Sequence, residues 1–161
     1  MKIIKNSLLL VAAIVFCSLQ VNAQSSKYKL MLQMTNYQGE KAYLVVSLIN
    51  AKGEYEKTLS VLGPNKKWYD SLEEWHKAQT KKAEQLSAIT GASIAGGERS
   101  ITTITLDDSK FDKGYKIRIE SSVENQKYYK EDAVIPLTKA GFSERVEGKG
   151  YVRYVKLNKL Q

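Results

Sequence analysis

The sequence contains very little of several residue types that often define a function. Among its 161 residues are one cysteine, Cys17, one histidine, His76, and two prolines. One cysteine excludes an internal disulfide framework, a zinc site built from several thiolates and a four-thiolate iron–sulfur cluster. One histidine excludes a multi-histidine metal site and leaves little basis for histidine-based catalysis. Any signal of function must therefore lie in local patterns rather than in composition.

The residues that are present describe a basic, globular chain. Hydrophobic residues make up 43% and charged residues 26%, which excludes a disordered or fibrous protein. The 25 Lys and Arg residues outnumber the 17 Asp and Glu residues, so the formal net charge is +8. The length fits one compact domain.

Residues 1–23 have the organisation of a cleaved signal peptide. Lys2 and Lys5 precede an apolar stretch over residues 7–17, and a more polar segment ends at Val21-Asn22-Ala23. This pattern predicts cleavage between Ala23 and Gln24, and therefore a periplasmic or extracellular protein. A membrane anchor is disfavoured because the apolar stretch is shorter than the roughly 20 residues of a spanning helix. Lipidation of Cys17 is disfavoured by the bulky Phe16 before it.

Export changes the inventory of the mature chain, residues 24–161, which we predict to be one domain. It retains no cysteine, and the loss of Lys2 and Lys5 lowers the net charge to +6. An exported basic protein does not meet nucleic acid as its normal partner. Anionic envelope surfaces, phosphorylated cofactors or acidic proteins are better candidates.

Most of the mature chain has the pattern of short β-strands. Tyr28–Met34 alternates apolar and polar residues, whereas 42–49 is apolar on both faces, as in a central strand. Lys52-Gly53 provides a turn into a hairpin partner at 54–62. The alternation at 115–120 turns Ile117 and Ile119 inward and Lys116, Arg118 and Glu120 outward. The other strand candidates are 101–106, 128–137 and 150–157.

One segment has helical spacing instead. Between residues 70 and 87, Leu72, Trp75, Ala83 and Leu86 fall roughly on one side of a helix, with Asp70 or Ser71 as its cap. Many short strands with one inserted helix predict a mainly β fold, an antiparallel immunoglobulin-like sandwich.

A loop rich in small residues follows the predicted helix. Residues 87–97 read Ser-Ala-Ile-Thr-Gly-Ala-Ser-Ile-Ala-Gly-Gly. Such a loop can approach a ligand closely and direct backbone N–H groups towards a phosphate, although many glycine-rich connections only reverse the chain.

The order of motifs over residues 43–120 resembles a known family. The run 43–49 is followed by Gly53, by Lys57-Thr58-Leu59, by Lys66-Lys67-Trp68-Tyr69 with Trp75, by Ala88-Ile89-Thr90-Gly91-Ala92-Ser93, and by Gly114-Tyr115 and Glu120. This order is similar to the predicted periplasmic proteins catalogued as domain of unknown function 2271. The N-terminal strand and the chain after Glu124 rest on periodicity alone.

The resemblance implies an extracytoplasmic β-sandwich without an established activity. It further implies a link to membrane electron-transfer proteins with PepSY-type domains and to the transferase that attaches FMN to exported proteins. The implied function is a non-catalytic accessory or binding module in flavin-dependent electron transfer, and FMN is a possible cofactor. The alternative is a structural or interaction module of the envelope with no redox role.

The loop also resembles the motif by which exported FMN-binding domains attach their flavin. Thr90-Gly91-Ala92-Ser93 matches, but Ser87 replaces the acid of the motif and Ala95 occupies the acceptor position. A methyl group cannot form a phosphoester, so covalent attachment at Ala95 is impossible. Thr90 and Ser93 retain hydroxyls outside the acceptor position, so a covalent FMN carrier is a disfavoured further alternative and FMN is expected to bind non-covalently.

The predicted cofactor-binding residues lie in this loop and in the helical segment before it. Trp68 and Trp75 are seven residues apart and could share a helix face that stacks on a flat ligand, although tryptophans beside a sandwich are also common core residues. Lys66, Lys67 and Arg99 could balance a phosphate. His76, and the turn residues Asp107, Asp108 and Asp112, carry no recognisable site, and we predict no catalytic or metal-binding residues. The predicted cofactor-binding set is Thr90, Gly91, Ala92, Ser93, Trp68, Trp75 and Lys67.

Overall fold

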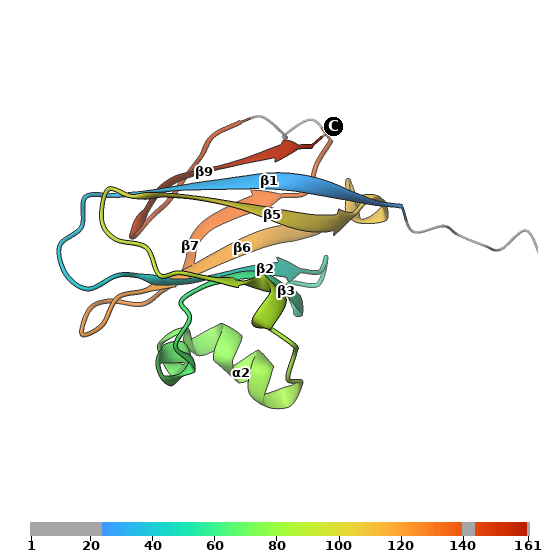
Figure 1. The fold of residues 1–161 in the computed structure, drawn as a ribbon. Coiled ribbons are helices and arrows are strands. Elements are labelled where there is room, and N and C mark those ends of the chain that lie inside the picture. Colours follow the sequence, from blue (N-terminus) through green and yellow to red (C-terminus); the bar gives the residue numbers. More distant parts are fainter. Residues whose placement is uncertain (1–23, 140–143, 161) are drawn as a thin grey trace, which may run out of the picture.

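The computed structural model describes residues 24–139 and 144–160, in which the strands form two sheets that face each other (Figure 1). One sheet has the order β5-β1-β9-β8 and the other has the order β4-β3-β2-β6-β7. The strands are β1 Ser25–Met34, β2 Tyr43–Ile49, β3 Tyr55–Leu62, β4 Thr90–Gly91, β5 Arg99–Asp107, β6 Lys116–Ser122, β7 Tyr129–Pro136, β8 Val146–Glu147 and β9 Val152–Lys159. The mainly β prediction is confirmed; immunoglobulin-like connectivity stays a prediction. The proposed signal peptide lies outside the described residues.

The main core lies between the two sheets and follows from the alternation of apolar residues. Tyr28, Leu30, Leu32 and Met34 of β1 are all at most 1% exposed, which confirms the predicted inward face of this strand. Ile117 and Ile119 of β6 reach the same core from the opposite sheet. The predicted hairpin is also confirmed, since β2 and β3 pair as antiparallel strands and Gly53 has a φ of +84°.

A second, smaller core lies on the outer face of the five-stranded sheet, where helical segments cover it (Figure 1). The 3-10 helix η1 spans Lys66–Ser71 and the α-helix α2 spans Glu73–Lys81. Val45 of β2 and Val61 of β3 pack there against Tyr69, Leu72 and Trp75. The five-stranded sheet is therefore buried on both faces, as the apolar run of β2 predicts.

The helix differs from its prediction at both ends. Leu72 breaks the helical path between η1 and α2 and is the N-cap of α2, without a side-chain cap. Neither Asp70 nor Ser71 is therefore the cap. At the other end Lys82 leaves the helix, and Glu84 turns back to accept a hydrogen bond from the backbone N–H of Thr58 on β3 (2.9 Å). This hydrogen bond connects the segment after α2 to β3.

Two further segments correct the sequence analysis. Arg118 and Glu120 of β6 do point away from the main core, but α2 covers them, and they are 6% and 0% exposed. Part of the small-residue loop is a strand, because Thr90 and Gly91 pair with Val61 and Leu62 as a parallel β-bridge pair, β4. The acidic turn residues all make structural contacts. Asp107 accepts a hydrogen bond from the N–H of Ser109, Asp108 accepts from the Ser26 hydroxyl of β1, and Asp112 accepts from the N–H of Lys139.

Candidate functional site

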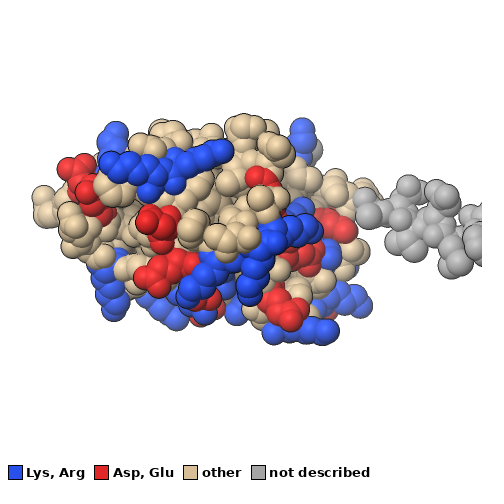
Figure 2. Space-filling view, turned by 90° about the horizontal axis from the view of Figure 1, so that it is seen from below, with Lys and Arg blue, Asp and Glu red and all other residues tan. Residues whose placement is uncertain are grey.

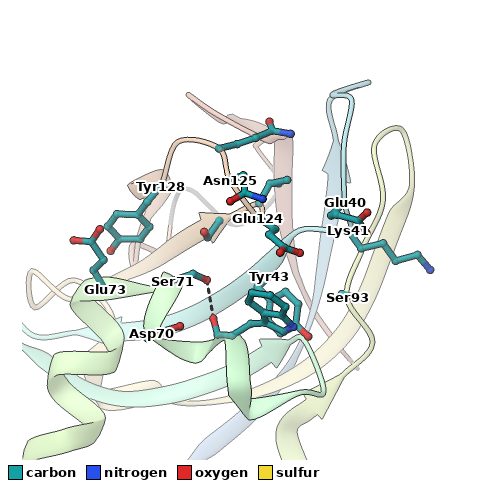
Figure 3. A pocket seen from close by; sticks show the side chains of 14 residues that line it. Glu40, Lys41, Tyr43, Asp70, Ser71, Glu73, Ser93, Glu124, Asn125 and Tyr128 are labelled. Carbon is teal, nitrogen blue, oxygen red and sulfur yellow. Dashed lines mark hydrogen bonds between the residues drawn. The ribbon is translucent and has the colours of Figure 1, made fainter.

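A cavity of about 590 Å³ opens beside the start of α2. Its walls come from the chain leading into β2, from η1 and the first residue of α2, and from the turn after β6 (Figure 3). The lining residues are Glu40, Lys41, Tyr43, Trp68, Asp70, Ser71, Glu73, Ser93, Ser122, Val123, Glu124, Asn125, Gln126 and Tyr128.

Three aromatic side chains line this cavity, and local structure positions each of them. The Tyr43 ring packs over Gly63, where a Cβ would stand 2.1 Å from the ring, so only glycine permits the contact. Trp68 lies in η1, whose cap Asn65 accepts a hydrogen bond from the N–H of Lys67. Tyr128 follows the turn after β6. The Trp68 ring already has the Lys67 ammonium 4.5 Å from its centroid, which is a cation–π contact.

Tyr128 connects the cavity to a buried polar network beneath α2. Its hydroxyl donates to Oε2 of Glu120 (2.6 Å) and accepts from the backbone N–H of Glu74 (3.1 Å). The same Glu120 oxygen accepts from the N–H of Trp75 (3.1 Å), and its other oxygen pairs with Arg118 (2.5 Å). Glu120 therefore satisfies the free N–H of Trp75 at the start of α2, and Tyr128, which it holds, satisfies that of Glu74, so the two side chains act as a cap from outside the helix.

Burial determines the electrostatics of this network. Burial raises the pKa of the Glu120 carboxyl, and the hydrogen bond from Tyr128, the charge of Arg118 and the N–H of Trp75 offset only part of that rise. Burial also raises the pKa of the Tyr128 phenol, and its bond to Glu120 adds to that rise. The Nε of Arg118 has no hydrogen-bond partner among the described residues. The network thus fixes the helix at a considerable desolvation cost.

The charge inside the cavity is opposite in sign to that of the whole chain. Four carboxylates line it, those of Glu40, Asp70, Glu73 and Glu124, against the single ammonium of Lys41, which extends away from the Tyr43 ring (Figure 3). Within residues 24–139 and 144–160, none of the four carboxylates has an ion pair or a side-chain hydrogen bond. On the molecular face that carries α2, basic and acidic side chains are interspersed (Figure 2).

A second cavity, of about 440 Å³, lies between the small-residue loop and β5. Thr90, Gly91, Ala92 and Ser93 all line it, so the structure brings these predicted site residues together with Arg99. Ser93 lines both cavities. The two cavities are therefore neighbours, with the loop between them.

The backbone of the loop is only partly available to a ligand. The N–H groups of Ile94, Ala95 and Gly97 donate to the Ala42 carbonyl, the Glu98 carboxylate and the Thr35 carbonyl. Those of Ala92, Ser93 and Gly96 have no partner in the described part of the chain. Gly96 is required by packing, since a Cβ there would stand 2.3 Å from the carbonyl oxygen of Tyr37. At Gly91, in contrast, a Cβ would meet Leu62 at an ordinary 3.5 Å.

The two predicted tryptophans have different environments. Trp68 is half-buried and lines the first cavity, whereas Trp75 is 0% exposed and donates its indole N–H to Thr58 (2.9 Å). The break at Leu72 separates them, so they do not share a helix face. Trp75 is a core residue, and Lys67 contacts Trp68 without lining either cavity. Ligand binding by the remaining predicted residues stays a prediction.

Sequence analysis missed Glu120, Arg118 and Tyr128 as organisers of this site. The signal was available in combination: a helix predicted to lie on the sheet must cover one face of β6, and charged residues on that face must then be buried in pairs. The four cavity carboxylates come from three separate segments, and no sequence pattern links them.

Comparison with known proteins yields one finding. Neither the curated proteins nor the solved structures include a match to this chain. Among residues 24–139 and 144–160, no helix combines the length and apolar character required to cross a membrane. A family model described as predicted periplasmic protein matches residues 25–154, beyond both ends of the motif order noted in the sequence. The chain therefore belongs to the family of predicted periplasmic proteins called domain of unknown function 2271.

Proposed function

We propose that this protein is a non-catalytic binding module of the cell envelope, and that the cavity beside α2 holds a positively charged segment of a partner protein. The observation that carries this proposal is the lining of the cavity: four unpaired carboxylates with the rings of Tyr43, Trp68 and Tyr128. Carboxylates attract lysine and arginine side chains, and aromatic faces accept them through cation–π contacts. An opening of about 590 Å³ accommodates one or two such side chains.

The partner that we propose is a component of flavin-dependent extracytoplasmic electron transfer, as the motif resemblance implies. The charges of the cavity support contact with a basic protein segment rather than with FMN itself, because the FMN phosphate would meet four carboxylates. If FMN binds, its phosphate fits better in the second cavity, where Arg99 and the N–H groups of Ala92 and Ser93 lie. The alternative is an envelope interaction module whose partner has no redox centre.

Photo-crosslinking in the producing cells tests this proposal. A photoreactive phenylalanine at Glu124, on the exposed rim of the cavity, is expected to capture a partner through a segment that contains Lys or Arg. The matched control places the same group at Glu144, which is exposed and does not line the cavity. A flavin- or haem-containing partner supports the redox role, and a partner without a redox centre favours the alternative. Equal capture from both positions would contradict a binding role for the cavity.

A further inference from the structure

We propose that two copies of this chain associate through β5, pairing edge to edge as antiparallel strands so that their four-stranded sheets become continuous. The proposal goes beyond the cavity beside α2. It rests on three features of β5: its unpaired edge, its lack of protective residues and its self-complementary sequence.

One edge of β5 is unpaired. Within the described residues β5 pairs only with β1, in an unbroken register from Ser25↔Asp107 to Gln33↔Arg99. Glu98 and Asp108, the residues just beyond the two ends of this register, form backbone hydrogen bonds on the β1 side. The even-numbered residues between them therefore also bond to β1. Because bonding direction alternates along a strand, the N–H and C=O groups of Arg99, Ile101, Thr103, Thr105 and Asp107 point to the open edge.

The other sheet edges are protected in recognised ways, and β5 is not. The edge strands β4 and β8 are two residues long, and the edge strand β7 contains Lys130, Glu131 and Pro136. Short strands, charges and prolines all prevent edge-to-edge pairing. β5 is nine residues long, and between Arg99 and Asp107 it contains only Ser, Thr, Ile and Leu. An unprotected edge of this kind promotes non-specific aggregation unless a specific partner strand covers it.

The sequence of β5 is complementary to itself in one register. When two copies pair antiparallel about Thr103, Arg99 of each copy lies opposite Asp107 of the other, and Ile101 lies opposite Thr105. All three kinds of pair join residues whose N–H and C=O groups point to the open edge, so the ladder can form along the whole strand. The ends of the paired strands are joined by two opposite-charge pairs, and their middle by pairs of β-branched residues. Both kinds of pair stabilise neighbouring strands.

The surroundings of β5 leave space for a second strand. The cavity of about 440 Å³ separates Arg99–Thr103 from β3 and from residues 88–94, so these segments do not close against the first half of β5. Ile101 is 57% exposed, so its side chain is available for contact with Thr105 of the second copy. Arg99 uses its Nε to donate to Gln33, which leaves its terminal nitrogens for Asp107 of the second copy.

Cysteine crosslinking of the mature chain, which has no cysteine of its own, tests the register. Residues directly opposite in a hydrogen-bonded pair have Cα atoms about 5.5 Å apart, a separation that a disulfide spans. On oxidation, Thr103→Cys is expected to form a covalent dimer. Ile101→Cys and Thr105→Cys are expected to crosslink poorly alone and well when mixed. A Thr103→Cys protein that stays monomeric, or a Thr105→Cys protein that crosslinks equally well alone, would overturn the proposal.

A charge exchange tests the same interface without a covalent bond. Light scattering of the mature protein is expected to give twice the chain mass, and Arg99→Asp is expected to lower the dimer affinity at least tenfold. Combining Arg99→Asp with Asp107→Arg restores the opposite-charge pairs and is expected to restore the dimer. Arg153→Asp, an equal charge change at an exposed residue of β9, should leave the dimer unchanged. A monomer at every concentration, or a dimer indifferent to Arg99→Asp, contradicts the proposal.

Discussion

Among the described residues, two carboxylates on neighbouring strands are fully buried, and they perform similar tasks in different ways. Glu120 on β6 and Asp132 on β7 are both 0% exposed. Glu120 faces the helix side, where it binds the start of α2 and pairs with Arg118. Asp132 binds the turn between β8 and β9, accepting from the N–H groups of Lys149, Gly150 and Val152 and from the Ser121 hydroxyl.

The difference lies in what each carboxylate is connected to. Asp132 fixes the turn between β8 and β9 and lines neither of the two cavities. Glu120 accepts a hydrogen bond directly from Tyr128, which lines the cavity beside α2. A buried charge can therefore serve stability alone or can also shape a binding surface, and only its neighbours distinguish the two roles. Substitutions at each position should separate these roles.

The largest loss of unfolding free energy is expected for Glu120→Ala. The change leaves the Arg118 guanidinium buried without its partner and removes the acceptor for the Trp75 N–H at the start of α2 and for the Tyr128 hydroxyl. Breaking one side of a buried pair costs about 3–5 kcal/mol of unfolding free energy. Chemical denaturation measures this loss, and hydrogen exchange should show faster exchange in residues 74–81. Unchanged exchange there would show that Glu120 does not fix α2.

Asp132→Ala should also lower the free energy of unfolding, but its local effect should be confined to the turn between β8 and β9. The N–H groups of Gly150 and Val152 and the Ser121 hydroxyl lose their acceptor, whereas the Lys149 N–H keeps the backbone carbonyl of residue 132. A loss of about 2–3 kcal/mol of unfolding free energy is expected from the buried donors left unpaired. Hydrogen exchange should accelerate in residues 148–152 and stay constant in α2. If α2 is disturbed equally, the two carboxylates do not have separate roles.

Sequence reasoning recovered the strands of this fold better than its site. The core face of β1 and the β2–β3 hairpin follow from local alternation and from one glycine, so they are predictable. The buried side of β6 is different, because burial of Arg118 and Glu120 depends on a helix that arrives from another part of the chain. The same applies to the glycines: Gly96 is explained by the distant backbone of Tyr37, which no local pattern reveals.

Tyr128→Phe should have a smaller effect on stability than either carboxylate. The ring stays, and the network loses one donor to Glu120 and the acceptor for the Glu74 N–H. The expected loss is about 1–2 kcal/mol of unfolding free energy. Tyr154→Phe provides the control, since the Tyr154 hydroxyl makes no hydrogen bond within the described residues. Equal losses for the two variants would argue against the network.

The smallest expected effect is a dependence of the unfolding free energy on pH. Because burial raises the pKa of Glu120 above its ordinary value of 4.5, the folded chain holds this proton to higher pH than the unfolded chain does. The contribution of Glu120 to stability is therefore greatest below pH 4.5 and declines as pH rises through the folded pKa. The stability of the wild type relative to Glu120→Gln should fall over this range. A relative stability that rises with pH would mean that Arg118 and the hydrogen bonds outweigh burial.

The most direct test of the cavity as a binding site is titration of the mature protein with short peptides of opposite charge. We expect a tetra-arginine peptide to bind more tightly than a tetraglutamate peptide by calorimetry, and added salt to weaken binding. Combining Asp70→Asn, Glu73→Gln and Glu124→Gln should reduce the affinity for tetra-arginine about tenfold, since each exposed pair contributes about 0.2–1 kcal/mol. The same charge change at Glu131, Glu144 and Glu147 should leave it within about twofold. Equal losses from both triple variants, or no preference for the basic peptide, would contradict the assignment of the cavity.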